Sequence, residues 1–131
     1  FMIIAGIESP ALGASEAALS RVKDYIQAGA DCILVKSKEE EPAELLEFCQ
    51  KYSSLENKVP LIVVSVCGQI SETQLKQKGV QAVFYPGYLL RSSYKAMSVT
   101  AEHILLHEGA REAEKFCAPL KNIFNIITEG K

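Results

Sequence analysis

One unit is repeated four times along this chain: a short, uninterrupted apolar run followed by an amphipathic helical segment. The apolar runs are residues 2–7, 32–35, 61–66 and 82–85. None of them alternates with polar residues, and continuous runs of this length are typical of strands that are covered on both faces in a parallel sheet. The repeat therefore predicts an α/β fold.

Helical patterns separate the runs and complete each repeat. They cover residues 15–27, 44–52, 71–78 and about 89–107. Gly29 and Gly79 lie where helices usually end in a left-handed residue, and the segments "AGADCILV" and "KGVQAVFY" repeat this junction. Right-handed crossovers place successive strands side by side. We expect four parallel strands in the order 1-2-3-4, with the helices on the outer face.

The last part of the chain has a different character. Residues 1–109 hold the four βα units, and residues 110–131 form a C-terminal helical extension. The extension contains "APLKNIFNII", an apolar helical stripe that must be covered by its own domain or by a neighbouring chain. It is a candidate oligomer contact.

Composition excludes several classes of function. The 131 residues carry a net charge of −2, which offers no electrostatic footprint for nucleic acid. The longest apolar runs fall far short of the about 20 residues that span a membrane, and no signal peptide is visible. The four cysteines form no Cys-x-x-Cys pair, which favours reduced thiols and a cytoplasmic protein.

Polar and charged residues follow the apolar runs, at the ends where parallel sheets bind ligands. Glu8 follows the first run, Lys36 and Ser37 the second, and Arg91 the fourth. Lys36 offers charge, Ser37 a short donor and Arg91 a fork for a carboxylate or phosphate. Each also has a structural interpretation: Glu8 pairs with Lys36 or a loop amide, Ser37 caps a helix, and Arg91 braces nearby glutamates.

Other candidate groups give weaker signals. His103 and His107 have the spacing of a two-point metal site, but no third ligand is evident, so we assign no metal site. Cys67 follows the third run and would be reactive only if its pKa were lowered. Glycine-rich phosphate-binding loops do not occur.

Four stretches of the chain resemble a known family. The stretches "FMIIAGIES", "YIQAGADCILVKSKEEEPAELLEF", "VPLIVVSVCG" and "GVQAVFYPGYLLRSSYKAM" resemble the C-terminal half of the phosphoenolpyruvate mutase branch of the isocitrate lyase superfamily. The resemblance implies strands five to eight of a (β/α)8 TIM barrel, that is, a half-barrel. It also implies Mg²⁺-dependent chemistry on P–C or C–C bonds of small anionic 2-oxo acids or phosphonates, with the metal-binding carboxylates in the other half.

The chain departs from the family at several rim positions. The resemblance implies an arginine where this chain has Gly6, a histidine where it has Lys36, and an asparagine-histidine pair where it reads "PGY". Glu8, Ser37, Lys38 and Arg91 fit the pattern, and Lys36 keeps a positive charge at its position. We take Glu8, Lys36, Ser37 and Arg91 as substrate-binding candidates. No catalytic residue is assigned, and we do not expect mutase activity from this chain alone.

Three hypotheses remain open. The chain is an enzyme half that pairs with a second copy or with a chain supplying the other half-barrel, a non-catalytic binder of small anions, or an assembly module. In each case we expect association, because a half-barrel exposes two sheet edges and an apolar face.

Overall fold

The computed structural model describes residues 1–8, 15–36, 43–64 and 70–129. Contacts between residues divide the chain into two compact units, Phe1–Pro86 and Gly87–Lys131. The first unit holds all the described strands with three helices, and the second holds the remaining helices. The boundary between the two units, after Pro86, lies earlier in the chain than the one expected from the sequence at residue 109. The fourth predicted helix, residues 89–107, therefore groups with the second unit.

The first unit is a four-stranded parallel sheet with a helix after each of its first three strands. The sequence prediction of parallel strands in the order β1-β2-β3-β4 is confirmed. The elements are β1 (Ile4–Glu8), α1 (Ser15–Gln27), β2 (Cys32–Lys36), α2 (Ala43–Ser53), β3 (Leu61–Val64), α3 (Glu72–Gln77) and β4 (Ala82–Phe84).

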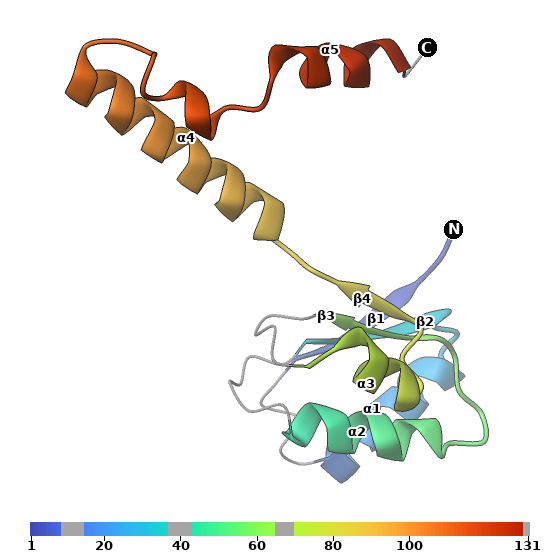
Figure 1. The fold of residues 1–131 in the computed structure, drawn as a ribbon. Coiled ribbons are helices and arrows are strands. Elements are labelled where there is room, and N and C mark those ends of the chain that lie inside the picture. The colour runs from blue at the N-terminus through green and yellow to red at the C-terminus, as the bar shows by residue number, and fades with distance from the viewer. Residues whose placement is uncertain (9–14, 37–42, 65–69, 130–131) are drawn as a thin grey trace. The chain divides into compact units, whose positions relative to one another are not determined.

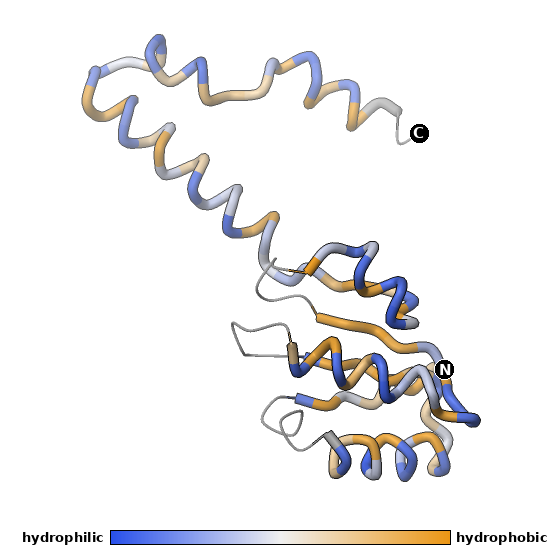
Figure 2. Tube along the Cα trace, turned by 60° about the horizontal axis from the view of Figure 1, so that its bottom comes forward, coloured by the Kyte–Doolittle hydropathy of each residue, from blue (hydrophilic) through white to orange (hydrophobic). Residues whose placement is uncertain are grey.

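The hydrophobic core lies between the sheet and its helices. Figure 1 shows α1, α2 and α3 on one face of the sheet. Alternate strand residues such as Ile7, Val35 and Val63 point to this face, where they pack with Val22 and Phe48, and all five are almost fully buried. In Figure 2 the middle strands are continuous hydrophobic stretches, whereas the helices mix hydrophobic and hydrophilic residues, as helices with one buried face do.

The opposite face of the sheet is apolar and only partly covered. Residues on this face alternate with the core residues along each strand. Ile4 and Phe84 are 43% and 48% exposed, Leu34 is half-buried, and Ile62 is nearly buried by its neighbours. None of the three helices of this unit covers this face (Figure 1). Large bare apolar faces are rare in monomeric proteins and mark interaction surfaces.

Local chemistry explains where the helices begin and end. Gly29 and Gly79 follow α1 and α3 with φ of 98° and 83°, so the left-handed conformation predicted for both is confirmed. Ser71 begins α3 with a capping box: its hydroxyl accepts a hydrogen bond from the Gln74 amide, and the Gln74 side chain accepts one from the Ser71 amide. The Tyr52 hydroxyl donates to the Val59 carbonyl over 2.6 Å and ties α2 to the approach to β3.

The second unit consists of α4 (Tyr88–His107), a short 3-10 helix η1 (Glu114–Phe116) and α5 (Leu120–Glu129). The His103 ring lies 4.6 Å from that of Phe116, which packs η1 against α4. The apolar stripe of α5 is exposed within this unit, and what covers it stays a prediction. Among the described residues, none of the helices is both long and apolar enough to cross a membrane.

Candidate functional site at the carboxyl ends of the strands

Glu8 and Lys36 come together at the carboxyl ends of two neighbouring strands. The register of β1 and β2 sets Glu8 opposite Lys36, and both side chains lie on the face away from the helices. Lys36 Nζ is 3.9 Å from Glu8 Oε1, and the two side chains are 38% and 60% exposed. An ion pair this exposed contributes at most about 1 kcal/mol to stability. The pair therefore adds little to the stability of the fold.

Below this pair the sheet face is apolar and leaves room. Gly6 is next on the same face of β1, and Leu34 lies opposite it on β2. A Cβ built at Gly6 meets no heavy atom within 4 Å, so the space above this residue is open. Val64 lies beside Lys36 on β3. The arrangement is a charged pair at the rim over an apolar floor, which suits a small anion with a short carbon skeleton.

The other predicted rim residues lie outside the described part of the chain or in the second unit. Ser37 and Cys67 lie outside the described residues. Arg91 is in the first turn of α4, where its backbone amide donates to the Gly87 carbonyl over 2.8 Å. Because Arg91 belongs to the second unit, its approach to Lys36 stays a prediction.

The two histidines of α4 stack on each other, with ring centroids 5.7 Å apart. Among the described residues no three His, Cys, Asp or Glu side chains lie close enough together to hold a metal ion. Glu8 and the two histidines are thus not part of a complete set of ligands within the described part of the chain.

The described thiols differ sharply in accessibility. Burial raises the pKa of the Cys49 thiol to about 12, and Cys32 is also buried. A thiol kept protonated in this way is a poor nucleophile. Cys117 is exposed, and its Sγ contacts the Ala113 carbonyl at 3.7 Å.

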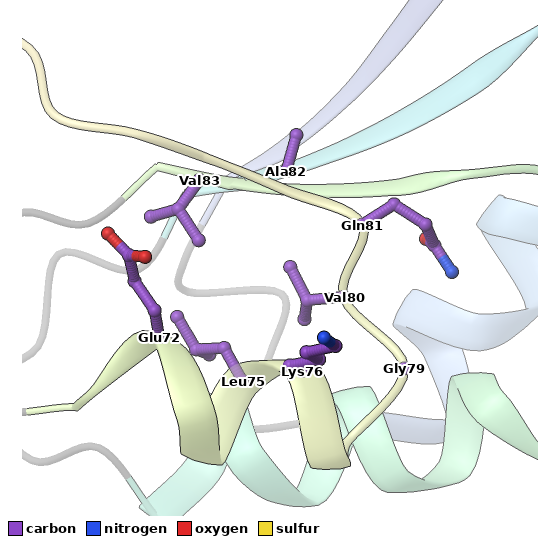
Figure 3. A pocket seen from close by; sticks show the side chains of 8 residues that line it. All are labelled: Glu72, Leu75, Lys76, Gly79, Val80, Gln81, Ala82 and Val83. Carbon is purple, nitrogen blue, oxygen red and sulfur yellow. The ribbon is translucent and has the colours of Figure 1, made fainter.

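A pocket of about 610 Å³ lies away from the rim pair, between α3 and β4 (Figure 3). Leu75 and Val80 form its apolar wall, with Glu72 at one end. Glu8 and Lys36 do not line it. It lies beside β4, which is an edge strand of the described sheet. The sequence analysis did not predict this pocket, since apolar residues on α3 and β4 signal core packing equally well.

Comparison with known proteins identifies the family. The model of the family described as phosphoenolpyruvate phosphomutase matches residues 1–105. The chain belongs to this family. The resemblance read from the sequence is thereby confirmed. A phosphoenolpyruvate phosphomutase of Tetrahymena pyriformis is 31% identical over the whole chain, and a phosphonopyruvate hydrolase of Variovorax sp. (strain Pal2) is 29% identical over 96% of it.

Solved structures of this family confirm the half-barrel. A phosphoenolpyruvate phosphomutase from Streptomyces platensis subsp. rosaceus superimposes with a TM-score of 0.85 at 33% identity, covering 99% of this chain and 45% of that one. A phosphonopyruvate hydrolase in complex with oxalate and Mg²⁺ gives 0.81 at 29% identity, covering 99% and 46%. The chain spans less than half the length of these relatives, including 43% of the Tetrahymena protein. Its four βα units therefore correspond to half of a family barrel.

Mg²⁺ is present in that hydrolase structure, and the described residues of this chain do not by themselves fit such an ion. Glu8 is the one carboxylate at the described strand ends, and Mg²⁺ requires near-octahedral oxygen coordination. We therefore derive no step through a metal ion from these residues.

Proposed function

We propose that this chain is the C-terminal half of a phosphoenolpyruvate phosphomutase-family barrel and supplies part of a rim site for a small anionic 2-oxo acid or phosphonate. The observation that carries the proposal is the Glu8–Lys36 pair at the carboxyl ends of β1 and β2 in a family half-barrel. The names of two relatives, a phosphomutase and a phosphonopyruvate hydrolase, support this substrate class.

In this proposal Lys36 provides positive charge for a carboxylate, phosphonate or developing oxyanion. At about 4 Å the attraction between unit charges is about 1 kcal/mol in water and several-fold stronger in a partly closed cleft. Glu8 opposes an anion unless it stays paired with Lys36, so the pair sets where the ligand's charge can lie. Ser37 and Arg91 are proposed as further hydrogen-bond donors to the same anion.

The half-barrel alone is proposed to be inactive. Gly6 cannot bind an anion with a side chain, and the described residues hold no complete metal site. The other four strands of such a barrel would be supplied by polypeptide outside residues 1–131, or their place would be taken by a second copy. A Mg²⁺ ion would then be held by carboxylates of that other half.

Phosphorus NMR tests this proposal. The 131-residue chain is incubated with Mg²⁺ and phosphonopyruvate or phosphoenolpyruvate, first alone and then with the N-terminal part of the Tetrahymena enzyme. No interconversion or phosphate release is expected from the chain alone, and conversion is expected in the mixture, with loss in Lys36→Ala. Conversion by the chain alone would contradict the proposal.

A second candidate function is non-catalytic binding of small anions. It is favoured by the same rim, in which Lys36 remains cationic while Gly6 leaves open space. A mixture that binds oxalate but converts neither substrate would support this alternative.

A further inference from the structure

We propose that α4 is a self-association surface, which pairs in antiparallel fashion with α4 of a second copy of this chain. The surface belongs to the second unit and differs from the bare sheet face of the first unit. The inference goes beyond the proposed function, because it takes neither a substrate nor a cofactor from it.

The first observation is an exposed apolar seam along α4. Five residues of this helix follow one another at alternating spacings of four and three, the repeat with which two helices pack side by side. They are Leu90, Tyr94, Met97, Ala101 and Ile104. The four large side chains among them are 40% to 74% exposed. An apolar stripe of this kind needs a partner that covers it.

The described part of the second unit covers another side of α4. The Phe116 ring of η1 lies 4.6 Å from the His103 ring, and Phe116 also lines a groove with Ala96 and Val99. These positions of α4 lie on the side of the helix that points away from the seam. The contact with η1 therefore leaves the seam open.

The order of large and small side chains along the seam favours an antiparallel pair. In that register the central layers join Met97 to Ala101 of the second copy, and the outer layers join Tyr94 to Ile104 of the second copy. Each contact occurs twice, as a two-fold axis requires. A parallel pair would set Ala101 against Ala101 and leave a gap between larger layers, which close packing disfavours.

The charges at the two ends of α4 indicate the same arrangement. Arg91 lies in the first turn, which contains no acidic residue, and Glu108 is the C-cap. The helix dipole favours acids at the start and bases at the end, so both charges are locally unfavourable. In the antiparallel register Arg91 lies beside Glu108 of the second copy, whereas a parallel pair brings like charges together. The charge order therefore suits an antiparallel second copy better than an isolated helix.

The length of the seam sets the strength of the contact. From Leu90 to Ile104 it spans about 21 Å of helix, which is two heptads. A contact this short should be weak and dependent on concentration. Arg91 can still donate to a bound anion in the pair, because a guanidinium carries several N–H donors in a fork.

The experiment is sedimentation equilibrium over a concentration series, with the full 131-residue chain. Met97→Glu should weaken association at least about ten-fold, because the pair would bury a carboxylate without a partner. Leu106→Glu is the matched control, since Leu106 is a 74% exposed residue of the same helix that lies away from the seam. It should associate like the wild type. Circular dichroism reports whether α4 stays helical in both variants.

Association through the sheet face is measured separately. Each α4 variant is therefore compared in the wild-type chain and in Phe84→Asp, which carries the charge on the sheet face. The effect of Met97→Glu should be the same in both backgrounds, because the two surfaces lie on different units.

Charge exchange between two chains identifies the partner. Arg91→Glu and Glu108→Arg should each associate about ten-fold more weakly than the wild type, because like charges then meet at both ends of the pair. Each change agrees with the helix dipole and should not destabilise α4 itself. A one-to-one mixture of the two variants should recover wild-type association, because opposite charges meet again at both ends of the mixed pair.

Three results would overturn the inference. A wild-type chain that stays monomeric in Phe84→Asp at every concentration would show that α4 does not self-associate. Equal association of Met97→Glu and Leu106→Glu would show that the seam is not the contact. A mixture that associates no better than its two components would show that the seam is covered by something other than an antiparallel α4.

Discussion

At the scale of single residues, the rim pair makes the sharpest prediction about ligand binding. Replacing Lys36 with Ala should abolish weak binding of phosphate or oxalate, which is expected in the millimolar range or weaker, because exposed contacts supply only about 1 kcal/mol each. Glu8→Gln should strengthen binding about two- to five-fold, because it removes the opposing charge. Chemical-shift titration by NMR measures both effects.

Lys51→Ala is the control for this titration, since Lys51 has a similar exposure and an acidic neighbour but lies on α2. It should bind like the wild type. Arg91→Ala tests whether the second unit contributes to the same site, and we expect it to weaken binding. If all four variants and the wild type respond alike, the rim holds no anion site.

Cys49 makes a prediction about stability at high pH. Its pKa is about 12 in the folded chain and 9.0 as the reference value, so the folded state keeps a proton that the unfolded state loses between these values. The free energy of unfolding should therefore be unaffected below about pH 9 and fall above it, by up to about 1.4 kcal/mol per pH unit. Urea midpoints at about pH 8 and about pH 10 measure this fall.

Cys49→Val is the comparison, because it removes the thiol at nearly constant size. The fall should be smaller in this variant but not zero, since burial also raises the pKa of Tyr52. Equal falls in both proteins would show that Cys49 does not govern the alkaline limit.

At the scale of elements, most of the fold can be predicted from the sequence because each βα unit contains local signals for where its strand and helix begin and end. The helix predicted at residues 15–27 has these bounds in the structure, and glycines end α1 and α3 as expected. The first strand begins later than its apolar run, at Ile4, and continues to Glu8, because pairing with Lys36 extends it past the last apolar residue. The 3-10 helix η1 has no periodic pattern to predict it.

The candidate site is harder to predict from the sequence than the fold, because part of it depends on contacts between segments that no local pattern specifies. Strand order and register place Glu8 beside Lys36, and both follow from the local repeat. The position of Arg91 depends on how the second unit packs, which no local pattern specifies. The open space at Gly6 depends on the absence of neighbouring atoms, which residue identity alone does not reveal.

The capping box of α3 provides a test at this scale. Ser71→Ala removes the acceptor for the Gln74 amide and should destabilise the first unit by about 1 kcal/mol. Thr73→Ala, an exposed change within the same short helix, should be neutral or slightly stabilising. Denaturant unfolding compares the two. A loss for Ser71→Ala no larger than that for Thr73→Ala would contradict a stabilising cap.

At the scale of the whole molecule, the bare sheet face and the two open edges predict association. A four-stranded half-barrel exposes Ile4 and Phe84 on one face and leaves β1 and β4 each unpaired on one side within the described sheet. Such edges and faces pair readily with another chain. We expect the 131-residue chain to sediment as a dimer or larger species at micromolar concentration.

Two variants with the same added charge locate the contact. Phe84→Asp places a carboxylate on the bare face, where burial against a partner would desolvate it at a cost of several kcal/mol, and should shift the protein toward monomer. Thr73→Asp adds the same charge on the exposed side of α3 and should leave the assembly unchanged. Because both variants keep the helix-side core intact, a difference between them in sedimentation velocity reports the sheet face itself. A compact wild-type monomer would mean that the face is covered within the chain by a closed arrangement and not by a second half-barrel. Equal behaviour of the two variants in an associated protein would mean that the contact does not involve this face.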